Sequence, residues 1–469
     1  IMNVLVVSLC VQISLGQTVV YPRLLEPRED GGLFTLHVRD GLTLNLKKSS
    51  IFFPHIYLAE HVEGKVINSL VNGTELERNL YHDSEHGSSL LVERRGRDVH
   101  VRGILTRDLR IEPLLAEKRS KHGDIGHKVY QVQMKLPDDY TVSSASRILK
   151  KRNLDETSSG VIEDILMEVF VLMDPSYSSH FSDWFSAVPY VAMFFNSVNN
   201  RFAEVSISGA KIELRVVGFE KSGPQPPYEK VNDDKIDGPL TFPLLDRYIA
   251  GTSTVNSADV VVLMTAYDLH LPDKNGRPNF AVQGLARVGK ACTNEKAAIV
   301  EDSPTFYTGV DAAAHEIAHL FGALHDGEGS AASCPARSGH IMTPANGDIR
   351  LLSFSSCSQT AMEAFFSGVD DWCLDVLSRN VMFARMTELP GTEVDGVALC
   401  KLKYPRFSNV TVATRPRDSM RCLIRCQMQK RRNTIYAFLR APDGTPCVYE
   451  GESEKICING LCVPKPISN

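Results

Sequence analysis

Three histidines and a glutamate lie close together in the chain, at a spacing that suits a metal ion. His315 and His319 are four residues apart, and Glu316 follows the first of them directly. On a helix, residues four apart are turned by only ~40° from one another, so both imidazoles can reach one metal ion. Glu316 would then contact a water at an open position of the metal and act as a general base. The pattern predicts metal-assisted hydrolysis.

The third histidine, His325, requires the helix to end. On a straight helix it would lie ~9 Å beyond His319 and ~240° around the axis. Gly322 is expected to end the helix, because glycine adopts left-handed backbone angles without a Cβ penalty. Three protein ligands and one water describe a catalytic zinc site, whereas four protein ligands close a structural one. We therefore predict one catalytic Zn²⁺ held by His315, His319 and His325.

The same histidines could instead be ordinary core residues. A bare His-Glu-x-x-His arises by accident in roughly one chain of this size in forty. With Gly322, His325 and Asp326 also fixed, the chance falls to roughly a few in a million, which favours the metal site.

The segments around the motif alternate between apolar strands and amphipathic helices. Strands are expected at residues 165–174, 211–220 and 258–266, and helices at residues 184–205, 239–251, 308–324 and 372–385. Such alternation predicts an α/β fold with a mostly parallel twisted sheet and long helices.

The chain of 469 residues is long enough for about three domains. Residues 1–16 are almost entirely apolar and predict a signal peptide. Residues 17–152 contain short strand-like runs and predict a β-rich propeptide. Residues 153–385 form the predicted protease domain, and residues 386–469 a linker with a Cys-rich domain. A basic cluster ending at Arg152 predicts cleavage by a processing convertase, the alternative being a solvated linker.

Ten of the eleven cysteines lie between Cys292 and Cys462, which predicts disulfides and therefore a secreted, extracellular protein. Asn72 and Asn409 each begin an Asn-x-Thr sequence, which is an acceptor pattern for N-glycosylation. The net charge of -5, with no basic stripe, argues against nucleic-acid binding. No segment after the signal is long and apolar enough to predict a membrane span.

The zinc motif, followed by Met342 within residues 339–344, resembles the metzincin clan of zinc peptidases. Asp326, directly after the third histidine, is similar to the adamalysin (reprolysin) branch, which includes snake-venom and ADAM-type metalloproteases. The resemblance implies a zinc metalloendopeptidase in which Met342 forms an apolar floor beneath the histidines. It also implies the disulfides Cys292–Cys373 and Cys334–Cys357.

Two carboxylates, Glu168 and Asp259, occupy positions similar to the calcium ligands of that family, so Ca²⁺ is a second candidate metal. The alternative is two solvated carboxylates at strand ends. The C-terminal segment resembles the Cys-rich region of ADAMTS-like proteins. The whole plan resembles the secreted salivary metalloproteases of ticks, which implies host haemostatic or matrix proteins, such as fibrinogen or fibrin, as substrates.

The expected activity is hydrolysis of peptide bonds in extracellular proteins by a zinc-activated water, with Glu316 as general base. Residues 17–152 contain no cysteine, so a propeptide thiol cannot block the zinc. Steric occlusion and folding assistance are expected instead. The alternative function is a non-catalytic secreted binding protein that uses its Cys-rich module, although the intact Glu316 argues against it.

Overall fold

The computed structural model describes most of the chain in three regions. The N-terminal module is described at residues 17–25, 34–62, 65–114, 119–121 and 123–133; the central domain at residues 165–272, 275–344, 352–370 and 373–374; and the C-terminal module at residues 396–404, 407, 409–430, 433–442, 444–447, 455–458 and 461–464. The signal peptide, the cleavage site at Arg152 and nearly all of the helix expected at residues 372–385 lie outside these residues. No helix of the described part is long and apolar enough to cross a membrane.

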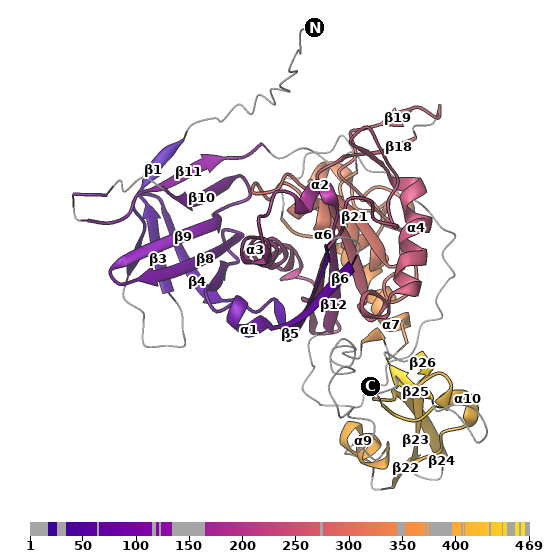
Figure 1. The fold of residues 1–469 in the computed structure, drawn as a ribbon. Coiled ribbons are helices and arrows are strands. Elements are labelled where there is room, and N and C mark those ends of the chain that lie inside the picture. The colour runs from indigo at the N-terminus through magenta and orange to yellow at the C-terminus, as the bar shows by residue number, and fades with distance from the viewer. Residues whose placement is uncertain are drawn as a thin grey trace.

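The central domain is built on a twisted sheet (Figure 1). Strand β12 (Ile165–Met173) pairs in parallel with β14 (Ala210–Lys221) on one side and β17 (Val260–Thr265) on the other. β21 (Ala297–Glu301) continues in parallel beside β17, and β20 (Gly284–Ala286) closes this edge in the antiparallel direction. β12, β17 and β21 are almost wholly buried, as expected for strands with both faces covered.

Helices cover both faces of this sheet. α3 (Trp184–Phe202) and α6 (Val310–Leu320) share one apolar core with the sheet, and α4 (Gly238–Gly251) belongs to a second core. Each helix and strand expected in the described part is present, but α6 ends at Leu320 rather than at residue 324. The other helices and strands of the domain are α2 (Pro175–Ser178), α5 (Ser253–Asn256), α7 (Ser356–Gly368), β13 (Ser206–Ile207), β15 (Val231–Asn232), β16 (Lys235–Asp237), β18 (Asp268–Pro272) and β19 (Pro278–Asn279).

The N-terminal module contains an antiparallel sheet in the order β1-β11-β10-β9-β8-β7-β4-β3-β2. Its strands are β1 (Thr18–Val20), β2 (Arg23–Leu25), β3 (Phe34–Arg39), β4 (Leu42–Lys48), β7 (Leu80–Asp83), β8 (Ser88–Arg95), β9 (Asp98–Ile104), β10 (Leu109–Pro113) and β11 (His127–Gln131). The sheet has an apolar core of its own, in which Leu36, Leu44 and Leu46 are fully buried.

One hairpin of this module departs from the expectation of a separate domain. β5 (Phe52–Val62) pairs in parallel with β14, and β6 (Lys65–Asn72) pairs antiparallel with β5, so both strands extend the sheet of the central domain. Figure 1 shows them with the strands of the central sheet and apart from the other strands of the module. The short helix α1 (Gly73–Leu76) follows, with Asn72 as its exposed N-cap.

The C-terminal module is small and held by three disulfides. Its sheets are formed by β22 (Val410–Val412), β23 (Leu423–Lys430) and β24 (Asn433–Arg440), and by β25 (Lys455–Ile458) and β26 (Leu461–Pro464); its helices are α9 (Gly396–Lys403) and α10 (Pro416–Ser419). The disulfides are Cys400–Cys426, Cys422–Cys457 and Cys447–Cys462. Asn409 is exposed.

Candidate metal centre

Helix α6 carries two of the three candidate ligands inside the protein. Every residue of the helix is buried, including His315, Glu316 and His319. Asp311, in its first turn, lies near the positive end of the helix dipole, where a carboxylate is favourable. A fully buried helix with this many polar residues requires a specific partner for each of them.

Gly322 ends the helix as the spacing predicts. Its φ is +92°, in the left-handed region that favours glycine. The Gly322 amide donates to His319 O at 2.8 Å, and the Ala323 amide donates to Ala318 O at 3.0 Å. The chain then turns back and brings His325 beside the two histidines of the helix.

The three imidazoles converge on one point. His319 Nε2 lies 3.0 Å from His315 Nε2 and 3.2 Å from His325 Nε2, and all three side chains are at most 2% exposed. His315 Nδ1 donates to Ile341 O, and His319 Nδ1 donates to Ala323 O, each at 2.7 Å. Because a carbonyl oxygen only accepts, these contacts leave the Nε2 lone pairs of His315 and His319 directed at the common point. The donor set fits a zinc ion.

The predicted methionine turn is hydrogen-bonded to residues of this cluster and next to it. Gly339 has φ +75°, and Ile341 and Met342 are fully buried in the core that contains α6. Ile341 supplies the carbonyl that orients His315, and Met342 O accepts from the amide of Asp326 at 2.8 Å. The turn is therefore bonded both to the first ligand and to the residue that follows the third.

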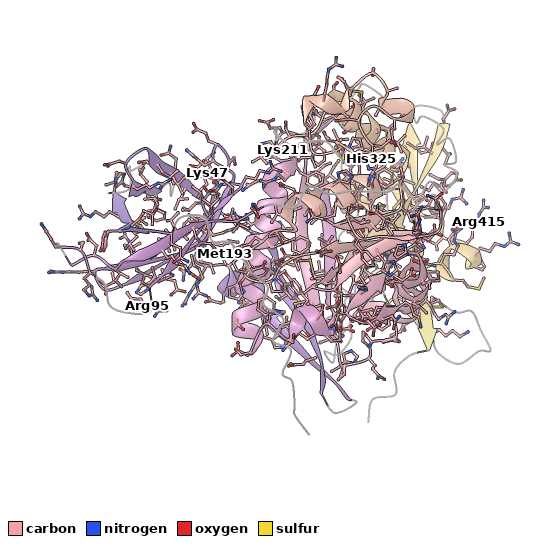
Figure 2. All side chains as sticks on the ribbon, turned by 90° about the horizontal axis from the view of Figure 1, so that it is seen from above. Lys47, Arg95, Met193, Lys211, His325 and Arg415 are labelled. Carbon is pink, nitrogen blue, oxygen red and sulfur yellow. A yellow bond between two sulfur atoms is a disulfide. The ribbon has the colours of Figure 1, made fainter. Side chains whose placement is uncertain are left out.

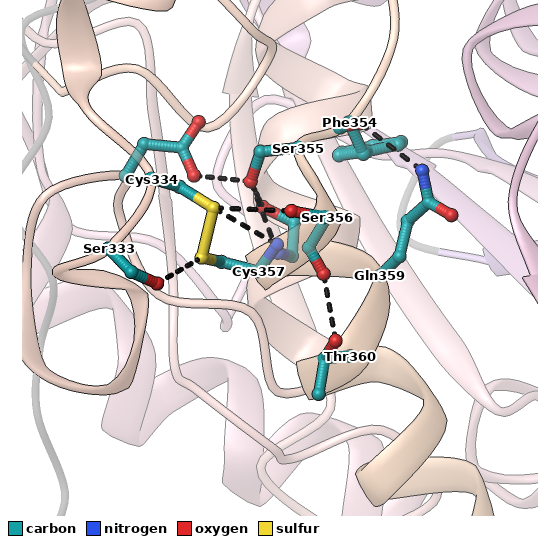
Figure 3. Close-up of a disulfide and its surroundings, with 10 residues drawn as sticks. Ser333, Cys334, Phe354, Ser355, Ser356, Cys357, Gln359 and Thr360 are labelled. Carbon is teal, nitrogen blue, oxygen red and sulfur yellow. Dashed lines mark hydrogen bonds between the residues drawn. A yellow bond between two sulfur atoms is a disulfide. The ribbon is translucent and has the colours of Figure 1, made fainter.

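Asp326 connects the third ligand to α7. Its Oδ1 accepts from Ser355 Oγ at 2.5 Å, and Ser355 in turn caps the start of α7 through the Ser358 amide. Figure 3 shows Ser355 beside the Cys334–Cys357 disulfide, where the Cys357 amide lies 3.2 Å from Cys334 Sγ. The Cys292–Cys373 disulfide is also present. Both pairings are those implied by the family resemblance.

Gly284 in β20 was not singled out from the sequence, yet it packs against Glu316. A Cβ on Gly284 would lie 2.4 Å from Glu316 Oε1 and 2.6 Å from its Cγ. β20 is the last strand at this edge of the sheet, so the general-base candidate lies against an edge strand. A lone glycine in an apolar strand carries no local signal for such a contact.

The candidate calcium ligands are buried, which contradicts the alternative of solvated strand ends. Glu168 is fully buried and Asp259 is 1% exposed, and Asp259 Oδ2 accepts from the Glu168 amide at 2.8 Å. Burial and the charge of Glu168 raise the pKa of Asp259, although Lys296 and Arg440 oppose this. Among the described residues, neither carboxylate belongs to a cluster of three potential metal ligands.

Comparisons with known proteins agree with this geometry. The reprolysin-type family model described as metallo-peptidase family M12 matches residues 166–355. Antarease, a venom metalloproteinase of the scorpion Tityus serrulatus, is 26% identical over 65% of this chain and 81% of its own length. A venom metalloproteinase of Olivierus martensii is 27% identical over 74% of this chain and 88% of its own.

An ADAMTS-like protein of Bombyx mori is 22% identical over 82% of this chain and 64% of its own length. These relatives do not support the resemblance to tick salivary enzymes. They support the resemblance to the adamalysin/reprolysin family. With the histidine cluster, they show a zinc metalloendopeptidase that carries a reprolysin-type M12 metallopeptidase domain at residues 166–355.

Proposed function

We propose that this chain is a secreted endopeptidase that cleaves extracellular proteins, with zinc held by His315, His319 and His325 and Glu316 as general base. The observation that carries the proposal is the convergence of three buried imidazole nitrogens, two of them on the helix that also carries the carboxylate of Glu316. A non-catalytic binding protein would have no need for a carboxylate at that position.

A zinc ion in this site supplies Lewis-acid polarisation of the scissile carbonyl and favours ionisation of water. Glu316 accepts a proton from the attacking water and delivers it to the leaving amine. The buried surroundings of Glu316 exclude bulk water, which strengthens its electrostatic interaction with the reacting groups.

The edge strand β20 gives the substrate a place to bind. A peptide in extended conformation adds to a sheet edge through main-chain hydrogen bonds. Since β20 lies at the end of the sheet and contacts Glu316 through Gly284, such a peptide would pass its scissile bond beside the general base.

The proposal includes a zymogen stage and a secreted location. The basic cluster before Arg152 supplies a convertase site, and Asn72 and Asn409 are exposed as glycosylation requires. The disulfides of the central domain and the C-terminal module fit an oxidising compartment. We further propose haemostatic and matrix proteins as substrates, selected in part by the C-terminal module.

The test is cleavage of fibrinogen and gelatin by the processed protein. The expected result is endoproteolysis that stops when a zinc chelator is added and returns when zinc is restored. Cleavage that persists after zinc has been removed completely would contradict the zinc mechanism. A folded, zinc-loaded protein that cleaves neither of these substrates nor a broad peptide library would favour the binding-protein alternative.

A further inference from the structure

We propose that the N-terminal module is a lasting part of the central domain's fold and that it stays bound as a second chain after the linker between them is cut. The inference concerns assembly and does not depend on the proposed activity. It rests on four sets of contacts between the module and the central domain.

The first contact is the hairpin that completes the central sheet. The register of β5 on β14 pairs Tyr57 with Gly218, Leu58 with Phe219 and Glu60 with Lys221. The approach is close, because a Cβ on Gly218 would lie 3.1 Å from Tyr57 O and 2.6 Å from the Phe170 ring. Loss of the module would expose the edge of β14, and proteins normally cover such an edge.

The second contact is a shared apolar core. Residues of the module that include Ile51, Phe52, Ile56 and Leu58 are buried in the same cluster as the side chains of β12, α3 and α6. The core beneath α6 is therefore built from both parts. Interfaces with a continuous apolar core of this kind are typical of obligate assemblies rather than of transient ones.

The third contact lies along α3, where buried polar groups of the two parts satisfy each other. Ser89 Oγ donates to Met193 O at 2.8 Å and accepts from Asn196 Nδ2 at 2.9 Å. Asn200 Nδ2 donates to Ser88 O at 3.1 Å. Figure 2 shows Met193 at this boundary, between Arg95 of the module and His325 of the metal centre. Separation would leave these groups without their partners.

The fourth contact reaches the start of the zinc helix. Arg107 of the module donates to Asp311 Oδ2 at 2.8 Å, and Arg201 of α3 donates to Asp311 Oδ1 at 2.9 Å. Burial alone would raise the pKa of Asp311, but the charges of Arg201 and Arg107 outweigh it and hold this pKa below its ordinary value. Loss of Arg107 would leave the buried carboxylate of Asp311 with one cationic partner instead of two, which is unfavourable.

Arg110 of the module, three residues after Arg107, is hydrogen-bonded to the backbone that leads into α6. Its guanidinium, with the residue only 2% exposed, donates to Phe306 O at 2.8 Å and Tyr307 O at 3.3 Å. Thr305 and Tyr307 have φ of +77° and +56°, which non-glycine residues adopt only when surrounding contacts hold them. The module therefore supports the conformation of the segment before the zinc helix.

These contacts predict what processing does. A cut in the linker removes a tether but none of the contacts described above, so the product is a non-covalent two-chain protein. Its module remains against β14, α3 and the N-terminal end of α6, whereas His315 and His319 lie one and two turns further along that helix. The metal site therefore keeps its shape while the module stays bound.

The experiment uses the full chain with a specific protease site inserted between residues 147 and 152. After complete cutting, the sample is diluted and analysed by size-exclusion chromatography and native mass spectrometry. The expected result is one species with the summed mass of both fragments. Elution of the central fragment alone without denaturant would overturn the proposal.

Two variants test whether the named contacts hold the chains together. Arg107→Ala removes a buried charge contact, so the dissociation constant of the cut protein should rise about tenfold or more. The matched control is Arg23→Ala, because Arg23 pairs with Asp124 inside the module and is half exposed. Equal dissociation constants for the two variants would overturn the assignment of the interface.

Discussion

Replacement of Gly284 by alanine tests how Glu316, the proposed general base, is positioned. The added Cβ would lie 2.4 Å from Glu316 Oε1 and 2.6 Å from Glu316 Cγ. Favourable contacts between such atoms begin near ~3.5 Å, so the side chain of Glu316 must move by about 1 Å. Glu316 is 1% exposed, so it cannot avoid the clash by moving into solvent.

The size of the effect follows from this displacement. A 1 Å misplacement of a catalytic group costs about 100-fold in rate, which is about 2.7 kcal/mol in the barrier. The Gly284→Ala variant should therefore lose about 100-fold in kcat on a fluorogenic peptide. Its zinc content should stay at one ion, because the alanine contacts no histidine nitrogen among the nearest atoms at this position.

The control for this variant is Gly251→Ala, at the end of α4, where an added Cβ meets no atom within 4 Å. It makes the same chemical change without a clash and should leave kcat unchanged. The pH profile of kcat adds a second readout, because displacement of the base alters its acid limb, whereas simple loss of folded enzyme does not. A kcat for Gly284→Ala within twofold of the Gly251→Ala value would refute the reasoning.

Three further predictions concern the supports of the site. Gly322→Ala places a side chain at φ +92° and should lower the free energy of unfolding by about 1–2 kcal/mol. The expected readouts are a lower unfolding midpoint and weaker retention of zinc against a chelator. Unchanged zinc retention would mean that this turn does not place His325. Met342→Ala leaves a cavity at a buried position and should lower the free energy of unfolding in urea by about 2–5 kcal/mol, whereas Met342→Leu should lower it by less than about 1.5 kcal/mol. Equal losses of stability in the two variants would exclude a packing role for Met342. The hydrogen bond to Glu220 raises the pKa of His61 above its ordinary 6.5, so the contribution of His61 to stability is full below pH 6.5 and is lost as pH rises through the folded-state pKa. His61→Ala should therefore reduce the pH dependence of the unfolding midpoint above pH 6.5, and an unchanged pH dependence would contradict this assignment.

Local sequence rules were sufficient to predict the zinc helix and the turn at Gly322, although the expected helix at residues 308–324 extends beyond the observed end at Leu320. The spacing of His315 and His319 requires a helix, and the position of His325 requires that the helix stop at Gly322, where the structure has φ +92°. These inferences depend on residues within one short segment. Helical and left-handed backbone geometry are fixed locally, so they can be derived before the fold is known.

The pairing of β5 with β14 could not be derived in the same way. An apolar run predicts that a strand is buried, but it does not say which strand lies beside it. The two strands are separated by more than a hundred residues, and their register depends on the shared core formed by Ile56 and Leu58. Sequence patterns alone therefore predict that the whole N-terminal segment is a separate module.

The polar contacts around α6 were missed for the same reason. Arg107, Arg110 and Asp311 are ordinary charged residues in the sequence, and only the tertiary fold brings them together. The pairing of the six C-terminal cysteines was also open, because six cysteines allow fifteen connectivities. Cys426 in β23 is fixed opposite Ala437 in β24 by the strand register, and such geometry restricts the pairing.

The proposed mechanism depends on Glu316 as general base beside a zinc ion held by three histidines. The most direct test is Glu316→Ala, with zinc measured by mass spectrometry of the metal and turnover measured on a fluorogenic peptide. The expected result is one bound zinc and a rate lower by about 100- to 10,000-fold, the range expected for loss of general acid–base catalysis. Turnover at the wild-type rate with zinc still bound would show that Glu316 is not the general base.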